Sequence, residues 1–159
     1  MSLLLIRHAV AWEREKWAKK SNDDSLRPLT KKGKNKFKLS AQGISLLIPE
    51  LSKILTSPFV RALDTATILS AYYKKIPFKV LNSPYPQMSQ LQKYVNSTKT
   101  IAFVGHEPHL SQLLGDLLHL NQTFPVPFKK GGIALVGPGK NGPELKIFMG
   151  PSYTDLKRI

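Results

Sequence analysis

Residues 2–9, "SLLLIRHA", set the fold class of this chain. A nearly continuous apolar run of this length is typical of a β-strand that is buried on both faces. The run ends in two polar side chains, Arg7 and His8. Similar runs follow at 53–57 ("KILTS"), 78–82 ("FKVLN") and 100–106 ("TIAFVGH"). These segments predict the strands of a mostly parallel sheet.

Helical patterns lie between these runs. Thr30 is placed to cap a helix that carries the first of three apolar stripes. The stripes are Phe37, Ala41, Ile44, Ile48 and Leu51; Ala62, Ala66, Leu69 and Tyr73; and Leu110, Leu113, Leu114, Leu117 and Leu118. At the end of the chain, "GIALVG" (132–137) and "LKIFMG" (145–150) flank the turn signal "PGKNGP" and predict a hairpin or two edge strands. The alternation predicts one domain over 1–159, a three-layer α/β/α sandwich with a mostly parallel central sheet. The longest loop is expected at 121–131.

Composition excludes several classes of protein. With 42% hydrophobic residues and no cysteine, the chain of 159 residues cannot form disulfides, thiol nucleophiles or thiolate metal sites. The apolar run at 3–6 is too short to span a membrane and lacks the flanks of a signal peptide. We therefore expect a soluble, cytoplasmic protein with no membrane partner. The sequence does not indicate an oligomeric state.

The net charge of +14 favours anionic partners. Ten of the 24 Lys and Arg residues fall between Arg14 and Lys38, which raises the alternative of a non-enzymatic domain that binds nucleic acid or another polyanion. However, the apolar stripe of the same segment places its lysines on the flanks and back of a helix. RNP-type aromatic motifs, helix-turn-helix signatures and zinc fingers are absent from the sequence, so this alternative rests on charge alone.

Reactive side chains follow three of the predicted strands. Arg7 and His8 end the first strand, "KILTS" leads through Ser57 to Arg61, and His106 ends "TIAFVGH". Ligands of open α/β sheets bind beyond the carboxyl ends of the strands, where these side chains converge. Guanidinium groups and a helix amino terminus together suit a phosphate dianion. Arg61 lies in the first turn of its helix, where a cation gains nothing from the helix dipole, which favours a role in binding.

Four motifs resemble the histidine phosphatase superfamily, which has the phosphoglycerate mutase-like fold. They are "LIRHA", "RPLTKKG" from Arg27, "SPFVRALDTA" and "VGHEPHL", in the order and spacing of that superfamily. The short chain and the "RPLT" element are most similar to its small branch, the SixA-type phosphohistidine phosphatases. The resemblance implies that His8 is the nucleophile and forms a phosphohistidine intermediate. It also implies that Arg7, Arg61 and His106 bind the phosphoryl oxygens, with Ser57 beside them, and that no metal or cofactor takes part.

The histidines also permit a metal site, formed by His8, His106 and His109 with an acid. The guanidinium of Arg7 beside such a site would repel a cation, and "HEPH" lacks the i, i+4 spacing of a zinc helix. We place His109 outside the site and expect His119 to stabilise a helix end.

The sequence departs from the superfamily pattern in three places. Ala9 replaces the usual glycine after the Arg-His pair, and Asp64 replaces the usual glutamine of the arginine helix. Members that cleave phosphomonoesters usually carry an acid after the strand that corresponds to "FKVLN", whereas "SPYPQMSQL" (83–91) has none here. The missing acid favours P–N substrates, since imidazole leaves more readily than an alkoxide. The predicted substrate is phosphohistidine in a protein, with small phosphorylated metabolites as the alternative.

Other acids remain within reach of the predicted site. Asp23 and Asp24, before "RPLT", are the first candidates for a proton donor to the leaving group. Glu13, Glu15 and Glu107 are the others.

Overall fold

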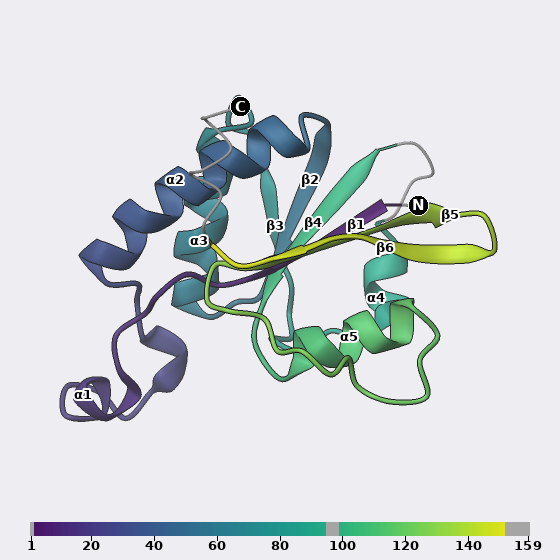
Figure 1. The fold of residues 1–159 in the computed structure, drawn as a ribbon. Helices are drawn as coiled ribbons and strands as arrows, with labels where there is room; N and C mark the ends of the chain where they lie inside the picture. The colour runs from purple at the N-terminus through teal and green to yellow at the C-terminus, as the bar shows by residue number, and fades with distance from the viewer. Residues whose placement is uncertain (1, 95–98, 152–159) are drawn as a thin grey trace.

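The computed structural model describes residues 2–94 and 99–151 and contains a six-stranded sheet of order β3-β2-β4-β1-β5-β6 (Figure 1). The strands are β1 (Ser2–Arg7), β2 (Leu51–Thr56), β3 (Phe78–Val80), β4 (Thr100–Gly105), β5 (Ile133–Gly139) and β6 (Gly142–Met149). The first four strands pair in parallel, and β5 and β6 pair antiparallel, as the predicted hairpin. The expected loop at 121–131 is confirmed, because it contains no helix or strand.

The helices form a layer on each face of the sheet, so the predicted α/β/α sandwich is confirmed (Figure 1). One layer contains α2 (Lys31–Leu47) and α3 (Val60–Ala71), and the other contains α4 (Met88–Gln92) and α5 (His109–Leu117). Along β1, Leu4 and Ile6 pack toward the first layer, whereas Leu3 and Leu5 pack toward the second. This alternation explains the continuous apolar run of β1, because both of its faces are buried.

The apolar stripe predicted for α2 extends beyond the end of the helix. Thr30 caps the helix as expected, with its Oγ1 accepting the Gly33 N–H at 2.9 Å. The helix ends at Leu47, and Leu51 already belongs to β2. The residue before a proline is disfavoured in the helical region, and Ile48, which precedes Pro49, has a φ of −130°. Ile48 and Leu51 nevertheless remain in the same buried cluster as the helix.

Two short elements that the apolar patterns did not indicate lie between β1 and α2. They are α1 (Arg14–Ala18) and a single 3₁₀ turn, Asp24–Leu26, and neither contains a buried residue. Their base is closed by a bridge between Ala11 and Leu29 and by the Trp12 N–H, which donates to the Pro28 carbonyl at 3.0 Å. The segment therefore projects beyond the carboxyl ends of the strands from a fixed base (Figure 1).

Within the described ranges, no helix of the protein is both long and apolar enough to cross a membrane.

Candidate active site

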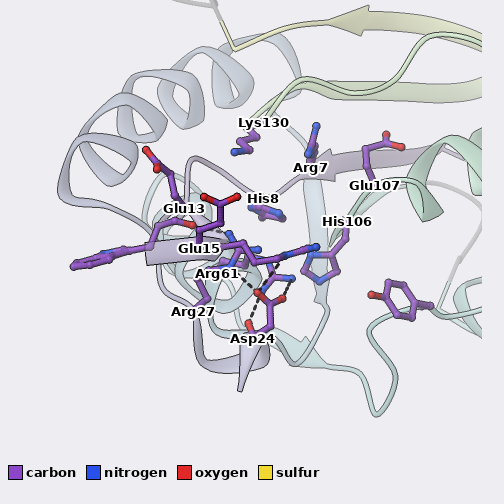
Figure 2. Close-up of a pocket in the computed structure, with 13 residues that line it drawn as sticks. Arg7, His8, Glu13, Glu15, Asp24, Arg27, Arg61, His106, Glu107 and Lys130 are labelled. Carbon is purple, nitrogen blue, oxygen red and sulfur yellow. Dashed lines mark hydrogen bonds and ion pairs between the residues drawn. The ribbon is translucent and has the colours of Figure 1, made fainter. Parts of the chain in front are cut away.

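The carboxyl ends of β1 and β4 bring His8 and His106 together. Arg7 lies opposite Gly105 in the parallel register, and the His8 N–H donates to the Gly105 carbonyl at 3.0 Å. As a result, the imidazole rings of His8 and His106 lie with their centres 5.2 Å apart. Both histidines line a pocket of about 510 Å³. Figure 2 shows them between Arg7 on one side and Arg61 on the other.

The orientation of His8 leaves one ring nitrogen with a lone pair. Nδ1 lies 2.7 Å from the Ala9 carbonyl oxygen. Because a carbonyl only accepts hydrogen bonds, Nδ1 carries the proton and the lone pair lies on Nε2. Burial lowers the pKa of His8 from 6.5 to about 3, and the nearby positive charges act in the same direction, against the hydrogen bond to Ala9. His8 is therefore neutral at physiological pH, with a lone pair on Nε2.

Ser57 holds the second histidine in place. The Ser57 hydroxyl oxygen accepts the Phe59 N–H at 3.2 Å and lies 2.6 Å from Nε2 of His106. When the hydroxyl donates to Nε2, the ring proton of neutral His106 lies on Nδ1. Nδ1 is buried and has no hydrogen-bond partner among the described residues, so it is available to a ligand oxygen. Burial lowers the pKa of His106 to about 3, and the charge of Arg61 adds to the effect.

The guanidinium groups of Arg7 and Arg61 are each held by one hydrogen bond from NH1, whereas the buried Nε–H of each makes no hydrogen bond to the described residues. Arg7 donates through NH1 to the Phe128 carbonyl at 2.6 Å, and Arg61 donates through NH1 to the Asp24 carbonyl at 2.8 Å. The Nε atom of each is buried without a hydrogen-bond partner in the part of the chain that the structure describes. Burial lowers the pKa of both guanidinium groups, although each remains a cation.

Asp24 connects three arginines at the pocket. Its carboxylate lies 2.8 Å from Nε of Arg27, 3.2 Å from NH2 of Arg61 and 3.6 Å from Nε of Arg14. Desolvation acts to raise the pKa of Asp24, but the hydrogen bond from Arg27 and the neighbouring positive charges outweigh it, and the pKa is lowered. Asp24 is therefore held as a carboxylate and is poorly suited to donate a proton. Its position instead fixes Arg61 against the pocket wall.

The structure brings most of the predicted site residues together. Arg7, His8, Arg61 and His106 all line the pocket, whereas Ser57 is fully buried behind His106 and does not. Of the candidate acids, Asp24, Glu13, Glu15 and Glu107 line the pocket. Asp23 does not, and its carboxylate caps Ser25. Figure 2 shows Glu13 and Glu15 on one side of His8 and Glu107 on the other.

The remaining lining residues were not predicted as site residues. They are Trp12, Arg14, Arg27, Tyr85 and Lys130. Arg27 carried a signal, since it opens the "RPLTKKG" motif, but its contact with Asp24 depends on the turn between them. Tyr85 comes from the segment that lacks an acid, and its ring lies edge-on to His106 with centres 6.2 Å apart.

The other two histidines do not line the pocket, although the ring of His109 lies 5.6 Å from the ring of Tyr85, centre to centre. Nε2 of His109 lies 2.8 Å from the Pro86 carbonyl oxygen, which connects the start of α5 to the segment before α4. His119 follows the end of α5 with a φ of 56°, and its N–H donates to the Asp116 carbonyl. Among the described residues, no group of three or more His, Asp or Glu side chains is arranged to hold a metal ion.

Several solved structures share this architecture. The protein histidine phosphatase SixA complexed with tungstate has a TM-score of 0.75 and 23% identity, covering 95% of this chain and 97% of its own. Phosphoserine phosphatase from Entamoeba histolytica has a TM-score of 0.73 and 18% identity, covering 96% and 98%. The alpha-ribazole phosphatase from Shigella flexneri has a TM-score of 0.70 and 16% identity, covering 95% and 97%. The chain thus has the phosphoglycerate mutase-like fold of the histidine phosphatase superfamily, as its motifs predicted.

One curated protein is also similar to this chain in sequence. An uncharacterized protein of Picosynechococcus sp. is 30% identical over an alignment of 148 residues, which covers 84% of this chain and 82% of the relative. The chain belongs to the same protein family as this relative. No protein-family model matches this chain.

Proposed function

We propose that this protein is a phosphatase that uses His8 as its nucleophile and removes the phosphoryl group from phosphohistidine in a protein. One observation carries the proposal. The free lone pair of His8 Nε2 lies in a pocket whose other walls supply Arg7, Arg61 and His106. These are the charges and donors that a transferring phosphoryl group needs. That SixA and two further phosphatases share the fold supports the same reaction class.

The reaction proceeds in two displacements. The Nε2 lone pair of His8 attacks phosphorus while the P–N bond of the substrate breaks, and its electron pair returns to the substrate imidazole. Protonation of the other ring nitrogen from solvent lets this imidazole leave as a neutral molecule. Water then attacks phosphorus in line, the bond from phosphorus to Nε2 breaks, and phosphate and a proton are released. Arg7, Arg61 and Nδ1 of His106 bind the phosphoryl oxygens throughout.

The acids of the pocket favour P–N over P–O substrates. An alkoxide requires a proton donor when it leaves. Asp24 is engaged by three arginines, and Glu107 accepts two hydrogen bonds through one oxygen. Glu13 is paired with Lys16 at 3.1 Å and is largely exposed. Glu15, the fourth pocket acid, is exposed on α1. These environments support a site in which no carboxyl group is held as a proton donor to the leaving group.

Small phosphorylated metabolites remain the second candidate substrates. The pocket favours them through Glu13 and Glu15, whose carboxylates could bind a cationic group beside the phosphate. Phosphoserine carries such a group, and a phosphoserine phosphatase shares this fold.

The test measures the intermediate and the substrate preference separately. After brief incubation with a phosphohistidine protein and an alkaline quench, we expect the phosphate on His8, with His8→Ala as the blank and His109→Ala as the matched control. An active preparation without phosphate on His8 would overturn the nucleophile. We also expect a much higher kcat/KM for a phosphohistidine peptide than for a phosphoserine peptide or free phosphoserine. A ratio near one would overturn the substrate assignment and leave the nucleophile intact.

A further inference from the structure

Glu107 and Arg7 contact the backbone of the same residue, Phe128, which is distant from both in sequence. It follows His106 between β4 and α5. Its Oε1 accepts the Ser111 hydroxyl at 3.0 Å and the Phe128 N–H at 3.0 Å. The first contact lies within the start of α5, and the second spans 21 residues to the end of the 121–131 loop.

Phe128 transmits the position of Glu107 to the guanidinium group. The carbonyl of this same residue accepts NH1 of Arg7 at 2.6 Å. The Phe128 ring is only 2% exposed and lies 5.2 Å from the Phe148 ring, centre to centre, so the residue cannot turn freely. A buried side chain with both backbone polar groups engaged is a rigid link between Glu107 and Arg7.

The residues after Phe128 tie the same segment to the backbone of the active site. The Gly131 N–H lies 3.1 Å from the carbonyl oxygens of both Arg7 and His8, and the Arg7 N–H donates to the Gly132 carbonyl at 3.0 Å. One end of the segment is therefore fixed by β1, and the other is fixed by Glu107. Without Glu107, the Phe128 end would lose the carboxylate that holds its N–H.

We propose that Glu107 is a positioning residue, which holds Phe128 so that its carbonyl aims the Arg7 guanidinium at the phosphoryl group. Its carboxylate does not act as the proton donor to the leaving group. This inference rests on the proposed function of the site. Electrostatics agree with the geometry: burial lowers the pKa of Arg7, and the negative charge of Glu107 opposes that effect.

Leaving-group dependence distinguishes the two roles. p-Nitrophenolate leaves without protonation, whereas the alkoxide of phosphoserine requires a proton. A positioning residue affects both substrates alike, whereas a proton donor affects phosphoserine selectively. Glu107→Gln retains an oxygen that can accept from Phe128 and Ser111 but cannot act as a carboxylic acid. We expect this variant to keep kcat within about threefold of the parent on both substrates, and Glu107→Ala to lose roughly ten- to a hundredfold on both.

A double-mutant cycle locates the effect at Arg7. In an Arg7→Lys background the fork that Phe128 aims is already absent, so Glu107→Ala should cause little further loss. Gln112→Ala, an exposed change on α5, is the matched control. Selective loss of phosphoserine cleavage in Glu107→Gln, or full additivity with Arg7→Lys, would overturn the proposal. If Glu107→Ala does not fold, the Glu107→Gln comparison decides alone.

Oxyanion binding separates this inference from the proposed function. Tungstate binding, measured by calorimetry, requires Arg7 but no turnover. We expect Glu107→Ala to weaken it about tenfold and Glu107→Gln to leave it near the parent value. A parent protein that neither binds tungstate nor hydrolyses phosphate substrates would refute the proposed function itself. A parent protein that does both, with Glu107→Ala unchanged, would refute only the role of Glu107.

Discussion

His8 and His106 are buried side by side among arginines, and this environment determines their charge. The exposed fractions are 5% for His8 and 3% for His106, and a protonated ring at either position would face Arg61. Desolvation and like charge therefore both favour the neutral imidazole. A neutral His8 ring with a lone pair on Nε2 is a direct consequence of this placement. The same placement makes folding sensitive to acid.

The stability of the protein should fall as the pH is lowered through 6.5. The pKa of each histidine is 6.5 in the unfolded chain and about 3 in the folded protein, so between these values the unfolded chain binds more protons. From these values we expect a loss of about 2 kcal/mol per histidine between pH 7 and pH 5. Urea unfolding at the two pH values measures the loss. In His8→Gln the loss in the free energy of unfolding between the two pH values should be smaller by about the contribution of one histidine.

Exposed histidines provide the control for this measurement. His119 is exposed and follows α5, so His119→Asn leaves the buried pair unchanged and serves as the matched control. If His8→Gln lost as much stability as the parent on acidification, His8 would not be buried in its neutral form.

At the level of elements, the start of α2 packs closely against the segment that follows His8. A Cβ on Gly33 would lie 2.1 Å from the Val10 carbonyl oxygen, which is much closer than any van der Waals contact. The same carbonyl accepts the Thr30 N–H at 3.0 Å, just before the helix begins. The glycine of "RPLTKKG" therefore permits a backbone approach that no larger residue allows.

Gly33→Ala should destabilise the protein although alanine is the better helix former. Relief of the clash requires Val10 or the start of α2 to shift, at a cost of about 1–3 kcal/mol, whereas alanine gains up to about 1 kcal/mol in helix propensity. We expect a net loss of roughly 1–2 kcal/mol in urea unfolding and a lower kcat, because Val10 lies two residues from His8. Asn35→Ala, an exposed change in the same helix, should not be destabilising. A stabilised Gly33→Ala protein would show that the approach is looser than described.

The elements differ in how far the sequence could predict them. β1 and β4 are evident from the sequence, because strands buried on both faces are apolar almost throughout. In β2 only the second half is buried, and this half gave the predicted run. The end of α2 was predicted four residues too late, because the apolar spacing continues beyond Pro49 while the backbone cannot. The α1 segment has no buried residues, so hydrophobic periodicity gives no signal there. Arg27 contacts Asp24 three residues away, but only because a 3₁₀ turn that the apolar pattern does not indicate lies between them. The contact of Glu107 with Phe128 spans 21 residues and depends on the tertiary fold, so it has no local pattern.

For the whole molecule, the excess of positive charge is spread over surfaces that the active site does not use. Four exposed lysines of α2 illustrate this: Lys31, Lys32, Lys36 and Lys38. They do not line the pocket, and no salt bridge is formed by any of them within the described parts of the chain. The sequence predicted this solvated basic face from the position of the apolar stripe. Whether the face binds a polyanion independently of the pocket can be measured.

Replacement of these four lysines by glutamine should affect DNA binding and leave phosphatase activity unchanged. In the parent we expect weak binding of duplex DNA at about 50 mM salt that is lost by about 200 mM, since each phosphate contact adds to the salt dependence. In the fourfold variant the binding should be lost already at the lower salt, while kcat/KM for p-nitrophenyl phosphate stays within about twofold because the four lysines lie outside the pocket. Nanomolar DNA binding that persists at about 200 mM salt would instead favour the polyanion-binding alternative, because attraction through a diffuse basic face cannot survive that screening.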